Sequence, residues 1–578
     1  MRSLLQLFRY LKPYTRQISL IIVAIFAAIM LELYLPTLMA NLVDVGIVND
    51  DMPYIYRTGG WMLVCALLAA VMTVTVSYLT SRVSSGFGRD VRRRLFVQVE
   101  GLSMQEFEKF GPASLITRTT NDIRQVQDVV NMMLGMMTRA PIMMVGGLIL
   151  AISRDAQLSL IFLASLPILA GAIMLIVRFA VPLFGALQKK TDRLNLILRE
   201  SLIGVRVIRA FNRVDDEKRR FNVANEDYRD TGIKVNRLLA YMFPVMLIVM
   251  NFTSISIIYF GGIRVDQGTM QIGNMMAFLQ YAMMILMSLI MLSMALVMIP
   301  RAQASAKRIN EVLQLQSSIR DAATTDKGSG RGASLVFKDV TFRYEGAARP
   351  VLDAISFEAQ AGETTAIIGS TGAGKTTLLQ MIPRFYDAES GSVQIGGTDV
   401  RQLPLKELRE SIGYVPQKAS LFRGTIEDNV RFGNEGMTEE QVRHALTIAQ
   451  AADFVDTREG GLASEVSQGG GNLSGGQKQR LSIARALARK TDIYLFDDSF
   501  SALDYKTDAR LRAALKDELR EAVVLIVAQR ISTVVDADQI IVLNEGKVAG
   551  IGTHDELLAT NEVYQEIVAS QQTKEESA

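Results

Sequence analysis

A run of small residues and one lysine, lying between two apolar segments, has the composition of a phosphate-binding loop. Residues 369–377 read Gly-Ser-Thr-Gly-Ala-Gly-Lys-Thr-Thr and fit the pattern G-x-x-x-x-G-K-[ST]. In this pattern the glycines let backbone N–H groups turn inward around phosphate oxygens. The lysine neutralises the β- and γ-phosphates, and the hydroxyl that follows it binds Mg²⁺. The run consists of Gly369, Ser370, Thr371, Gly372, Ala373, Gly374, Lys375, Thr376 and Thr377.

The flanking residues support this interpretation. Residues 365–368 are apolar and strand-like, and residues 378–382 are apolar and helix-like. A helix that begins directly after the loop points its positive end at the phosphates. A glycine-rich turn that binds nothing is the alternative, and the agreement of pattern and context disfavours it. The sequence therefore predicts that the chain binds ATP with Mg²⁺, with Lys375 on the phosphates and Thr376 on the metal.

The overall composition limits the class of protein. The 578 residues are 49% hydrophobic and 21% charged, and the apolar residues are concentrated in the first 300. A net charge of +3 is too near balance to indicate a nucleic-acid partner. The only cysteine, Cys65, excludes an internal disulfide framework.

Six long apolar segments in the first half predict a membrane domain. They lie near residues 17–40, 60–82, 135–153, 157–178, 239–263 and 274–299, and each approaches the roughly 20 residues that a helix needs to cross a bilayer. Lys and Arg crowd the second-to-third and fourth-to-fifth connections, whereas the alternate loops carry only Arg57, Arg154 and Arg264. By the positive-inside rule, we expect a multi-pass protein of the cytoplasmic (inner) membrane with both termini in the cytoplasm.

The two basic connections have almost no Gly or Pro, so they are expected to be helices that continue out of the membrane. We expect each to turn around a short segment, near residues 112–120 and 201–211. Such tips are either solvated charged hairpins or docking elements that transmit motion from the ATP-binding domain. We favour docking.

Some residues within the spans have unusual chemistry. Glu32 and Arg139 are ionisable at membrane depth, where a charge is costly unless it faces a partner or a wet cavity. Glu32 could attract cationic cargo or form a structural pair. The sixth span is rich in methionine, which suits either a cavity for varied apolar ligands or ordinary helix packing.

The second half changes in pattern. Residues 321–332 are small, polar and unperiodic, as in a linker, and from Ser334 short β-rich runs alternate with helical ones. The predicted fold is therefore multidomain: an all-α polytopic membrane domain with six transmembrane helices, followed by an α/β P-loop ATPase domain. The predicted boundaries are 1–315 for the membrane domain, 316–333 for the linker and 334–578 for the ATPase domain.

Further motifs occur before and after the phosphate loop, in a familiar order. They are Tyr344 in Val-Thr-Phe-Arg-Tyr (340–344), Gln417 in Tyr-Val-Pro-Gln (414–417), Leu-Ser-Gly-Gly-Gln (473–477), Ile-Tyr-Leu-Phe-Asp (493–497) and Ser-Ala-Leu-Asp (501–504). With these motifs residues 334–570 resemble the ATPase domain of an ABC transporter. With the six spans, the whole chain resembles a half-transporter of the type IV exporter family, related to multidrug exporters. In that family two half-transporters pair and enclose two ATP molecules.

The resemblance implies roles for these residues. Tyr344 would stack on adenine, Gln417 would reach Mg²⁺ and the attacking water, and Asp497 would hold Mg²⁺. The signature segment would bind the γ-phosphate of the nucleotide held by the other subunit, through a serine, backbone N–H groups and a helix start. It comprises Ser474, Gly475, Gly476 and Gln477.

Two positions depart from the family pattern. Asp498 stands where the family has the glutamate that acts as general base, and Gln529 stands where it has the switch histidine. Asp498 is shorter by one carbon–carbon bond, about 1.5 Å. A general base must lie within about 2.6–3.2 Å of its proton, so this loss of reach should slow hydrolysis. Gln529 can hydrogen-bond a phosphate but cannot titrate as histidine does.

These departures predict a catalytically weak ATP site in this chain. The intact signature would complete a competent site on a different half-transporter, so we expect a heterodimer whose partner carries the glutamate and the histidine. The predicted function is ATP-driven efflux of amphipathic small molecules, drug-like or lipid-like, across the lipid bilayer. The alternatives are a lipid or peptide exporter and a nucleotide-gated channel or regulatory subunit.

Overall fold

The computed structural model describes residues 2–322 and 334–575. The chain divides into two compact units, of which the first is Met1–Glu100 with Ala113–Leu315 and the second is Gly101–Pro112 with Gln316–Ala578. Residues 323–333, which form most of the predicted linker, lie outside the described residues.

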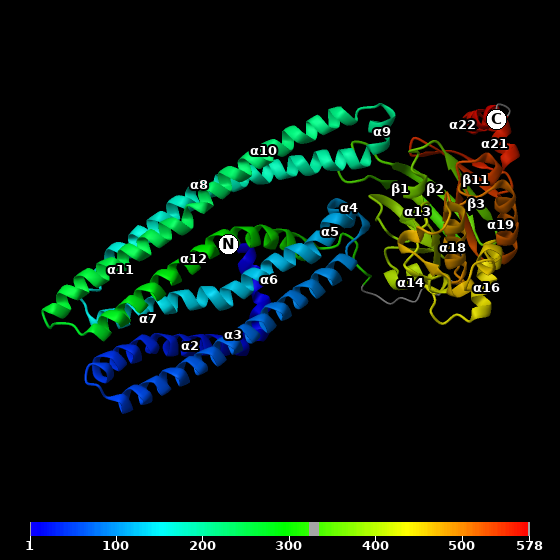
Figure 1. Ribbon diagram of the computed structural model, residues 1–578. Coiled ribbons are helices and arrows are strands. Elements are labelled where there is room, and N and C mark those ends of the chain that lie inside the picture. The colour runs from blue at the N-terminus through cyan, green and yellow to red at the C-terminus, as the bar shows by residue number, and fades with distance from the viewer. Residues whose placement is uncertain (1, 323–333, 576–578) are drawn as a thin grey trace. The chain divides into compact units, whose positions relative to one another are not determined.

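The first unit consists of helices, and six helical stretches of the described residues are long and apolar enough to cross a membrane. The six-span prediction is therefore confirmed (Figure 1). The elements are α1 (Arg2–Phe8), η1 (Arg9–Tyr14), α2 (Thr15–Asn41), η2 (Leu42–Ile47), α3 (Met52–Glu100), α5 (Pro112–Thr117), η3 (Arg118–Asp122), α6 (Ile123–Met132), η4 (Met133–Met137), α7 (Thr138–Arg154), α8 (Leu160–Ile203), α9 (Val205–Ala210), α10 (Val214–Ala240), α11 (Met242–Asp266) and α12 (Ile272–Leu313).

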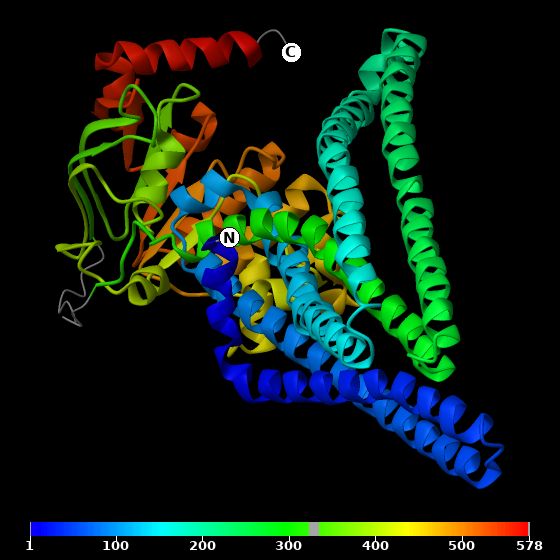
Figure 2. The ribbon, with the colours of Figure 1, turned by 90° about the vertical axis from the view of Figure 1, so that its left-hand side faces the viewer.

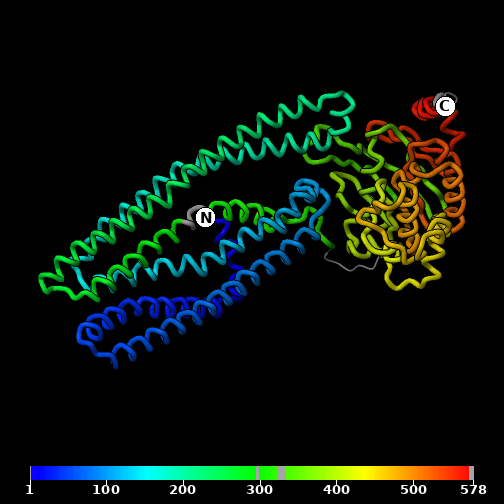
Figure 3. The backbone as a smooth tube through the Cα atoms, in the orientation of Figure 1, coloured from blue at the N-terminus to red at the C-terminus, as the bar shows by residue number. Residues whose placement is uncertain are grey.

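Long antiparallel pairs organise this unit. Helix α2 packs along α3, α8 packs along α10 and α11, and α12 packs against α7 and α2 (Figures 1 and 3). A cluster of buried apolar residues joins α2, α8 and α12, where the rings of Phe162 and Phe278 stack 5.3 Å apart and Tyr281 is fully buried. The pair formed by α8 and α10 extends away from the pair formed by α2 and α3 (Figure 2).

The tip of the first cytoplasmic hairpin lies earlier in the chain than residues 112–120, where we expected it. Helix α4 (Met104–Phe110) begins with a capping box between Ser103 and Glu106, and Gly111 ends it with φ +72°. Pro112 then starts the next helix, because its missing N–H costs nothing at a first helical position. In the second hairpin the short helix α9 forms the tip.

The second unit contains two larger sheets. One has six strands in the order β12-β11-β3-β10-β9-β6, parallel except for the β11–β12 pair, and the other is antiparallel in the order β2-β1-β4-β5. The strands are β1 (Ser334–Phe342), β2 (Leu352–Gln360), β3 (Thr364–Gly369), β4 (Ser390–Ile395), β5 (Thr398–Asp399), β6 (Ile412–Val415), β7 (Gly424–Thr425), β8 (Glu465–Val466), β9 (Ile493–Asp497), β10 (Val523–Val527), β11 (Gln539–Asn544) and β12 (Lys547–Gly552).

Helices cover both faces of the parallel sheet, whose central strands β9 and β10 are buried along their whole length. The α/β prediction for this half is therefore confirmed. The helices are α13 (Lys375–Met381), α14 (Leu405–Glu410), α15 (Ile426–Arg431), α16 (Glu439–Ile448), α17 (Ala452–Asp456), η5 (Gly461–Ala463), η6 (Gln468–Gly470), α18 (Gly475–Leu487), α19 (Tyr505–Glu518), α20 (Ile531–Val534), α21 (His554–Thr560) and α22 (Glu562–Glu575).

Candidate nucleotide-binding site

The order of the parallel strands brings the predicted site residues to one edge of the sheet. Strands β3, β10, β9 and β6 are neighbours, and the carboxyl ends of parallel strands meet at the same edge. Gly369 ends β3, Asp497 ends β9, Gln529 lies two residues beyond β10, and Gln417 lies two residues beyond β6. These residues come from four separate stretches of sequence, and the sheet alone makes them neighbours.

The phosphate loop turns sharply between β3 and α13. Gly372 and Gly374 have φ of +87° and +98°, a region that side chains with a Cβ disfavour. A Cβ on Gly374 would also lie 2.8 Å from the carbonyl oxygen of Val351. Both the conformation and the close approach therefore require glycine at this position, and helix α13 starts immediately after it.

Lys375 is buried at the start of α13, and its ammonium group is held by the loop. Its Nζ donates to the carbonyl oxygens of Gly369 at 2.7 Å and Ser370 at 2.8 Å. Burial lowers the pKa of the ammonium group, and the carboxylates of Asp498 and Asp497 act in the opposite direction. A desolvated cation that donates to two carbonyl oxygens and lies near two carboxylates suits a phosphate oxygen as a further partner.

Thr376 and Asp497 form the predicted metal side of the site. The Thr376 hydroxyl donates to Asp497 Oδ1 at 3.0 Å. Asp497 is 1% exposed, and its pKa is raised by burial and by the neighbouring Asp498 charge, although the bond from Thr376 lowers it. Two hard oxygen donors side by side fit Mg²⁺, which takes few protein ligands and completes its shell with phosphate and water oxygens.

Asp498 is held by both glutamines of the site. Gln529 Nε2 donates to Asp498 Oδ2 at 2.7 Å, and Gln417 Nε2 donates to the same oxygen at 3.3 Å. The backbone of Asp498 has φ +46°, and its N–H donates to the carbonyl oxygen of Val527. Burial raises the pKa of its carboxyl group, while Gln417, Lys375, Arg530 and Gln529 lower it. The sequence pointed to the two unusual residues separately, and the structure joins them in one hydrogen-bonded cluster.

Tyr344 lies near the start of α13 in an aromatic cluster. Its hydroxyl shares a 3.0 Å hydrogen bond with Thr377 Oγ1, and its ring packs edge-on against Phe342 and Tyr386. Burial raises the pKa of the Tyr344 hydroxyl. Tyr344, the predicted adenine-stacking residue, therefore lies beside the first turn of α13.

Helix α4 also contributes to this cluster, which no motif in the sequence indicates. The pKa of the Tyr386 hydroxyl is raised, first by burial and then by the nearby carboxylate of Glu108 on α4. Lys109 makes a 3.4 Å ion pair with Glu345, the residue after Tyr344. The charges of residues 104–110 were visible in the sequence, but nothing local indicated which surface they contact.

The signature residues form a separate helix start. Ser474 caps α18 and accepts from the N–H of Gln477, whose side chain returns a bond to the N–H of Ser474. Gly475 and Gly476 form the first turn, and a Cβ on Gly476 would lie 3.2 Å from the carbonyl oxygen of Ala502. Among the described residues, no hydrogen bond or ion pair joins this segment to the phosphate loop.

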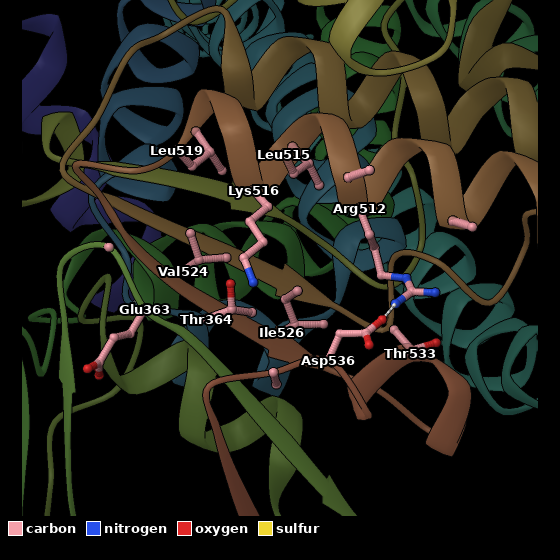
Figure 4. Close-up of a pocket in the computed structure, with 14 residues that line it drawn as sticks. Glu363, Thr364, Arg512, Leu515, Lys516, Leu519, Val524, Ile526, Thr533 and Asp536 are labelled. Carbon is pink, nitrogen blue, oxygen red and sulfur yellow. Dashed lines mark hydrogen bonds and ion pairs between the residues drawn. The ribbon is translucent and has the colours of Figure 1, made fainter. Parts of the chain in front are cut away.

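A cavity of about 360 Å³ lies at the other edge of the parallel sheet (Figure 4). It is lined by Thr364, the first residue of β3, by Val524, the second residue of β10, and by residues of α19. At its rim Arg512 Nη1 donates to Asp536 Oδ2 at 3.2 Å, so cations and carboxylates are balanced there. Since amino and carboxyl ends of parallel strands lie at opposite edges, this cavity is not the nucleotide site.

Two family models match the chain. Residues 18–290 match the ABC transporter transmembrane region, and residues 352–501 match the ABC transporter model. The second range contains the phosphate loop, Gln417, the signature residues and both aspartates.

Similar proteins cover nearly the whole chain. An uncharacterized ABC transporter ATP-binding protein of Mycobacterium tuberculosis is 42% identical over 568 residues, or 97% of each chain. The uncharacterized ABC transporter ATP-binding protein YfiB of Bacillus subtilis is 37% identical over 98% of each chain. An ATP-dependent lipid A-core flippase of Desulfotalea psychrophila is 31% identical over 86% of each chain.

A solved structure shares the fold. The structure of a bacterial Atm1-family ABC exporter with ATP bound superimposes with a TM-score of 0.81, covering 96% of this chain and 99% of the other. The two sequences are 23% identical, so this likeness concerns the fold.

Proposed function

Because the chain belongs to the ABC transporter family and has the architecture of an exporter half-transporter, we propose that it forms a heterodimer in which its own ATP site hydrolyses slowly. The hydrogen-bonded cluster of Asp498, Gln417 and Gln529 carries this proposal. The proposal places the complex in the cytoplasmic membrane with both termini inside, as the distribution of Lys and Arg indicates.

The cluster explains why hydrolysis would be slow. A general base must direct an oxygen at the water that attacks the γ-phosphate, and positioning one is worth on the order of 10²–10⁴ in rate. In this chain both amides donate to the same oxygen, Asp498 Oδ2, on a side chain that is already short. The two donors therefore hold Asp498 Oδ2, and their contribution lowers the pKa of the carboxyl group and with it the basicity of the carboxylate.

The binding functions of the same site are expected to remain. Tyr344 would stack on adenine, Lys375 would replace one of its carbonyl partners with a phosphate oxygen, and the loop glycines would present N–H groups. Thr376, Asp497 and Gln417 would hold Mg²⁺, which when bound neutralises charge on the β- and γ-phosphates. This chain would then hold ATP for longer than it takes the partner to complete a turnover.

The signature segment would act on the nucleotide of the partner. Ser474 and the free N–H groups at the start of α18 form a positive helix end that suits a γ-phosphate. Among the described residues no hydrogen bond or ion pair joins them to the chain's own phosphate loop, which agrees with a site completed by a second subunit. The competent site of the heterodimer would therefore combine this signature with a partner loop that carries the glutamate and the histidine.

ATP binding would drive alternating access. Closure of the two ATPase domains would move the hairpin tips, among them α4, which belongs to the same compact unit as the ATPase domain. That movement would open the membrane cavity outward, and hydrolysis at the competent site would reset it.

Amphipathic organic compounds are the proposed cargo. On α12, Met276, Met283 and Met287 are exposed and share one face at helical spacing. Flexible thioethers adapt to ligands of varied shape. Two relatives are named ATP-dependent lipid A-core flippases, which makes a lipid-like cargo the second candidate.

The pairing is tested by purifying the tagged chain from its own membranes in mild detergent. We expect mass spectrometry to find an equal amount of a second half-transporter, with glutamate and histidine at the positions matching Asp498 and Gln529. We also expect the pair to hydrolyse ATP at least tenfold faster than the chain alone. A complex of identical copies with the same turnover as the pair would overturn the proposal.

Cargo is tested with the pair in proteoliposomes. ATP-dependent accumulation of a fluorescent amphipathic cation would support drug-like efflux, and movement of a labelled lipid between leaflets would support the lipid alternative. Ion flux without accumulation of either would favour a nucleotide-gated channel.

A further inference from the structure

A basic cavity lies on the first unit, between the N-terminal segment and the cytoplasmic end of α3. Its volume is about 920 Å³. Arg9, Tyr10 and Lys12 of η1 form one wall, and Arg93 and Arg94 of α3 form another. Nothing in the proposed transport cycle uses this cavity.

The charge of the lining is strongly positive. Four cations face one carboxylate, that of Asp90. Asp90 is already engaged, because it accepts a 2.8 Å hydrogen bond from the Tyr14 hydroxyl and a 2.9 Å bond from Arg89. An anion entering the cavity would therefore meet cations without competition from a free carboxylate.

The four cations make few contacts of their own. Arg94 lies over the ring of Tyr10, 5.1 Å from its centre, and Arg9 Nε donates to the carbonyl oxygen of Gln6 at 3.1 Å. Within residues 2–322 and 334–575, none of Arg9, Lys12, Arg93 and Arg94 forms an ion pair with a carboxylate within 4.0 Å. Arg93 interacts electrostatically with Asp90 but forms no ion pair with it, so the charges of the four side chains are largely left for a ligand.

The cavity lies at the level where a membrane helix begins. The hydrogen bond from Tyr14 to Asp90 holds the residues that precede α2 against α3. The apolar part of α2 then starts at Ile18. From there Leu20, Val23 and Phe26 are exposed at helical spacing on one face of α2. In the proposed orientation these residues face acyl chains, and the basic lining is at the headgroups of the cytoplasmic leaflet.

We propose that this cavity binds the phosphate headgroup of an anionic phospholipid of the cytoplasmic leaflet, with its acyl chains along Leu20, Val23 and Phe26. Basic pockets between helices on the cytoplasmic side select anionic headgroups, and arginine forks fit phosphate oxygens. The inference rests on the proposed orientation and on no feature of the ATP site.

The experiment titrates phosphatidylglycerol into the delipidated full-length chain in detergent and counts bound lipids by native mass spectrometry. Removing two cations with Arg93→Gln/Arg94→Gln should weaken binding of the first lipid on the order of 20-fold, about fivefold for each charge. Arg93→Lys/Arg94→Lys keeps the charge and should retain most of the affinity. Lys189→Gln/Arg193→Gln removes two exposed cations of α8 and should leave binding unchanged.

Several outcomes would overturn the inference. Equal affinity for phosphatidylcholine, or an equal loss in the α8 control, would show binding without a specific site. Displacement of the lipid by millimolar inorganic phosphate would show a site for free anions instead. If the first variant does not fold, Arg9→Gln/Lys12→Gln on the opposite wall must give the same loss, and retained affinity there would equally refute the site.

Discussion

At the scale of single residues, the informative contact is the shared oxygen of Asp498. A histidine at position 529 could gain or lose a proton near neutral pH, whereas the Gln529 amide donates at every pH. The short carboxylate and the permanent donor therefore complement each other. Restoring one without the other leaves the geometry incomplete, which makes the two positions a coupled pair.

We predict that Asp498→Glu/Gln529→His raises ATP turnover of the heterodimer more than the sum of the single substitutions. Asp498→Glu alone should give a small increase, because Gln529 would still hold the carboxylate. The double variant should add roughly tenfold or more to the turnover of this chain's own site. Steady-state ATPase assays measure turnover, and the affinity for a fluorescent ATP analogue serves as the control and should not change. Additive or absent gains would contradict the coupling.

At the scale of elements, α4 is fixed to the rest of the second unit by a polar network around Glu106. Its carboxylate accepts from the N–H of Ser103 at 3.0 Å and from the N–H of Ser318 at 3.2 Å. Burial raises the pKa of Glu106, but the hydrogen bonds from Ser103 and Ser318 lower it by more than burial raises it. The net pKa is therefore lowered from the usual value of 4.5. The exposed Lys109–Glu345 pair contributes less, about 0–1 kcal/mol.

We predict that the attachment of α4 depends on pH through Glu106. A carboxyl group whose pKa falls on folding stabilises fully above its unfolded value, 4.5, and the contribution disappears as pH drops through the lower folded value. Glu106→Gln should increase hydrogen exchange of residues 103–110 at pH 7 by severalfold. The variant should also lose the increase in exchange that the unsubstituted chain shows when the pH drops below the pKa of Glu106. Glu345→Gln, which breaks only the exposed pair, is the matched control. Equal exchange in both variants would refute the role of Glu106.

The helices α2 and α7 are joined by an ion pair at membrane depth. Arg139 Nη2 lies 2.5 Å from the carboxylate of Glu32, and both side chains are mostly buried. Of the two roles left open for Glu32, a structural pair agrees with this contact. Breaking such a pair leaves an uncompensated charge in a medium of low dielectric, which costs more than removing both charges.

We predict that Glu32→Gln or Arg139→Gln alone lowers the thermal midpoint of the full-length chain in detergent, and that the double substitution recovers most of the loss. A double-mutant cycle on the midpoint measures the coupling. If Glu32→Gln instead abolishes efflux of cationic cargo without changing the midpoint, Glu32 is a cargo residue.

At the scale of the whole molecule, the proposed function gives this chain one surface that would bind nucleotide and another that would act in the ATP site of its partner. Lys375 belongs to the first and Ser474 to the second. If the heterodimer is asymmetric in this way, substituting Lys375 and substituting Ser474 should impair different functions.

We predict that Lys375→Ala abolishes binding of an ATP analogue to the isolated chain, because the buried cation on the phosphates is lost. Ser474→Gly should leave that binding intact and lower the ATPase rate of the heterodimer at least tenfold. Glycine is a good helix cap, so this change should cost α18 only a few tenths of a kcal/mol. Binding assays on the isolated chain and ATPase assays on the pair separate the two effects. A loss of analogue binding in Ser474→Gly would contradict action in the partner's site.

Local patterns predicted the six spans, the α/β half and the phosphate loop. Each depends on residues that are close in sequence: apolar runs of spanning length, alternation of strands and helices, and glycines between a strand and a helix. Lys375 and Thr376 could be located in this way because the loop and its helix are one continuous segment. The tip of the first hairpin lies before residues 112–120, because Gly111 ends one helix and Pro112 starts the next.

The sequence by itself determined which chemical groups this protein has: a nucleotide loop, six spans, and an aspartate and a glutamine at two unusual positions. Only the tertiary structure decided which of them meet. Gln529 and Gln417 lie 31 and 81 residues from Asp498, and Arg139 lies 107 residues from Glu32. The physical reason is that such contacts follow from strand order and helix packing, which depend on the burial of the whole core and leave no periodicity in the local sequence.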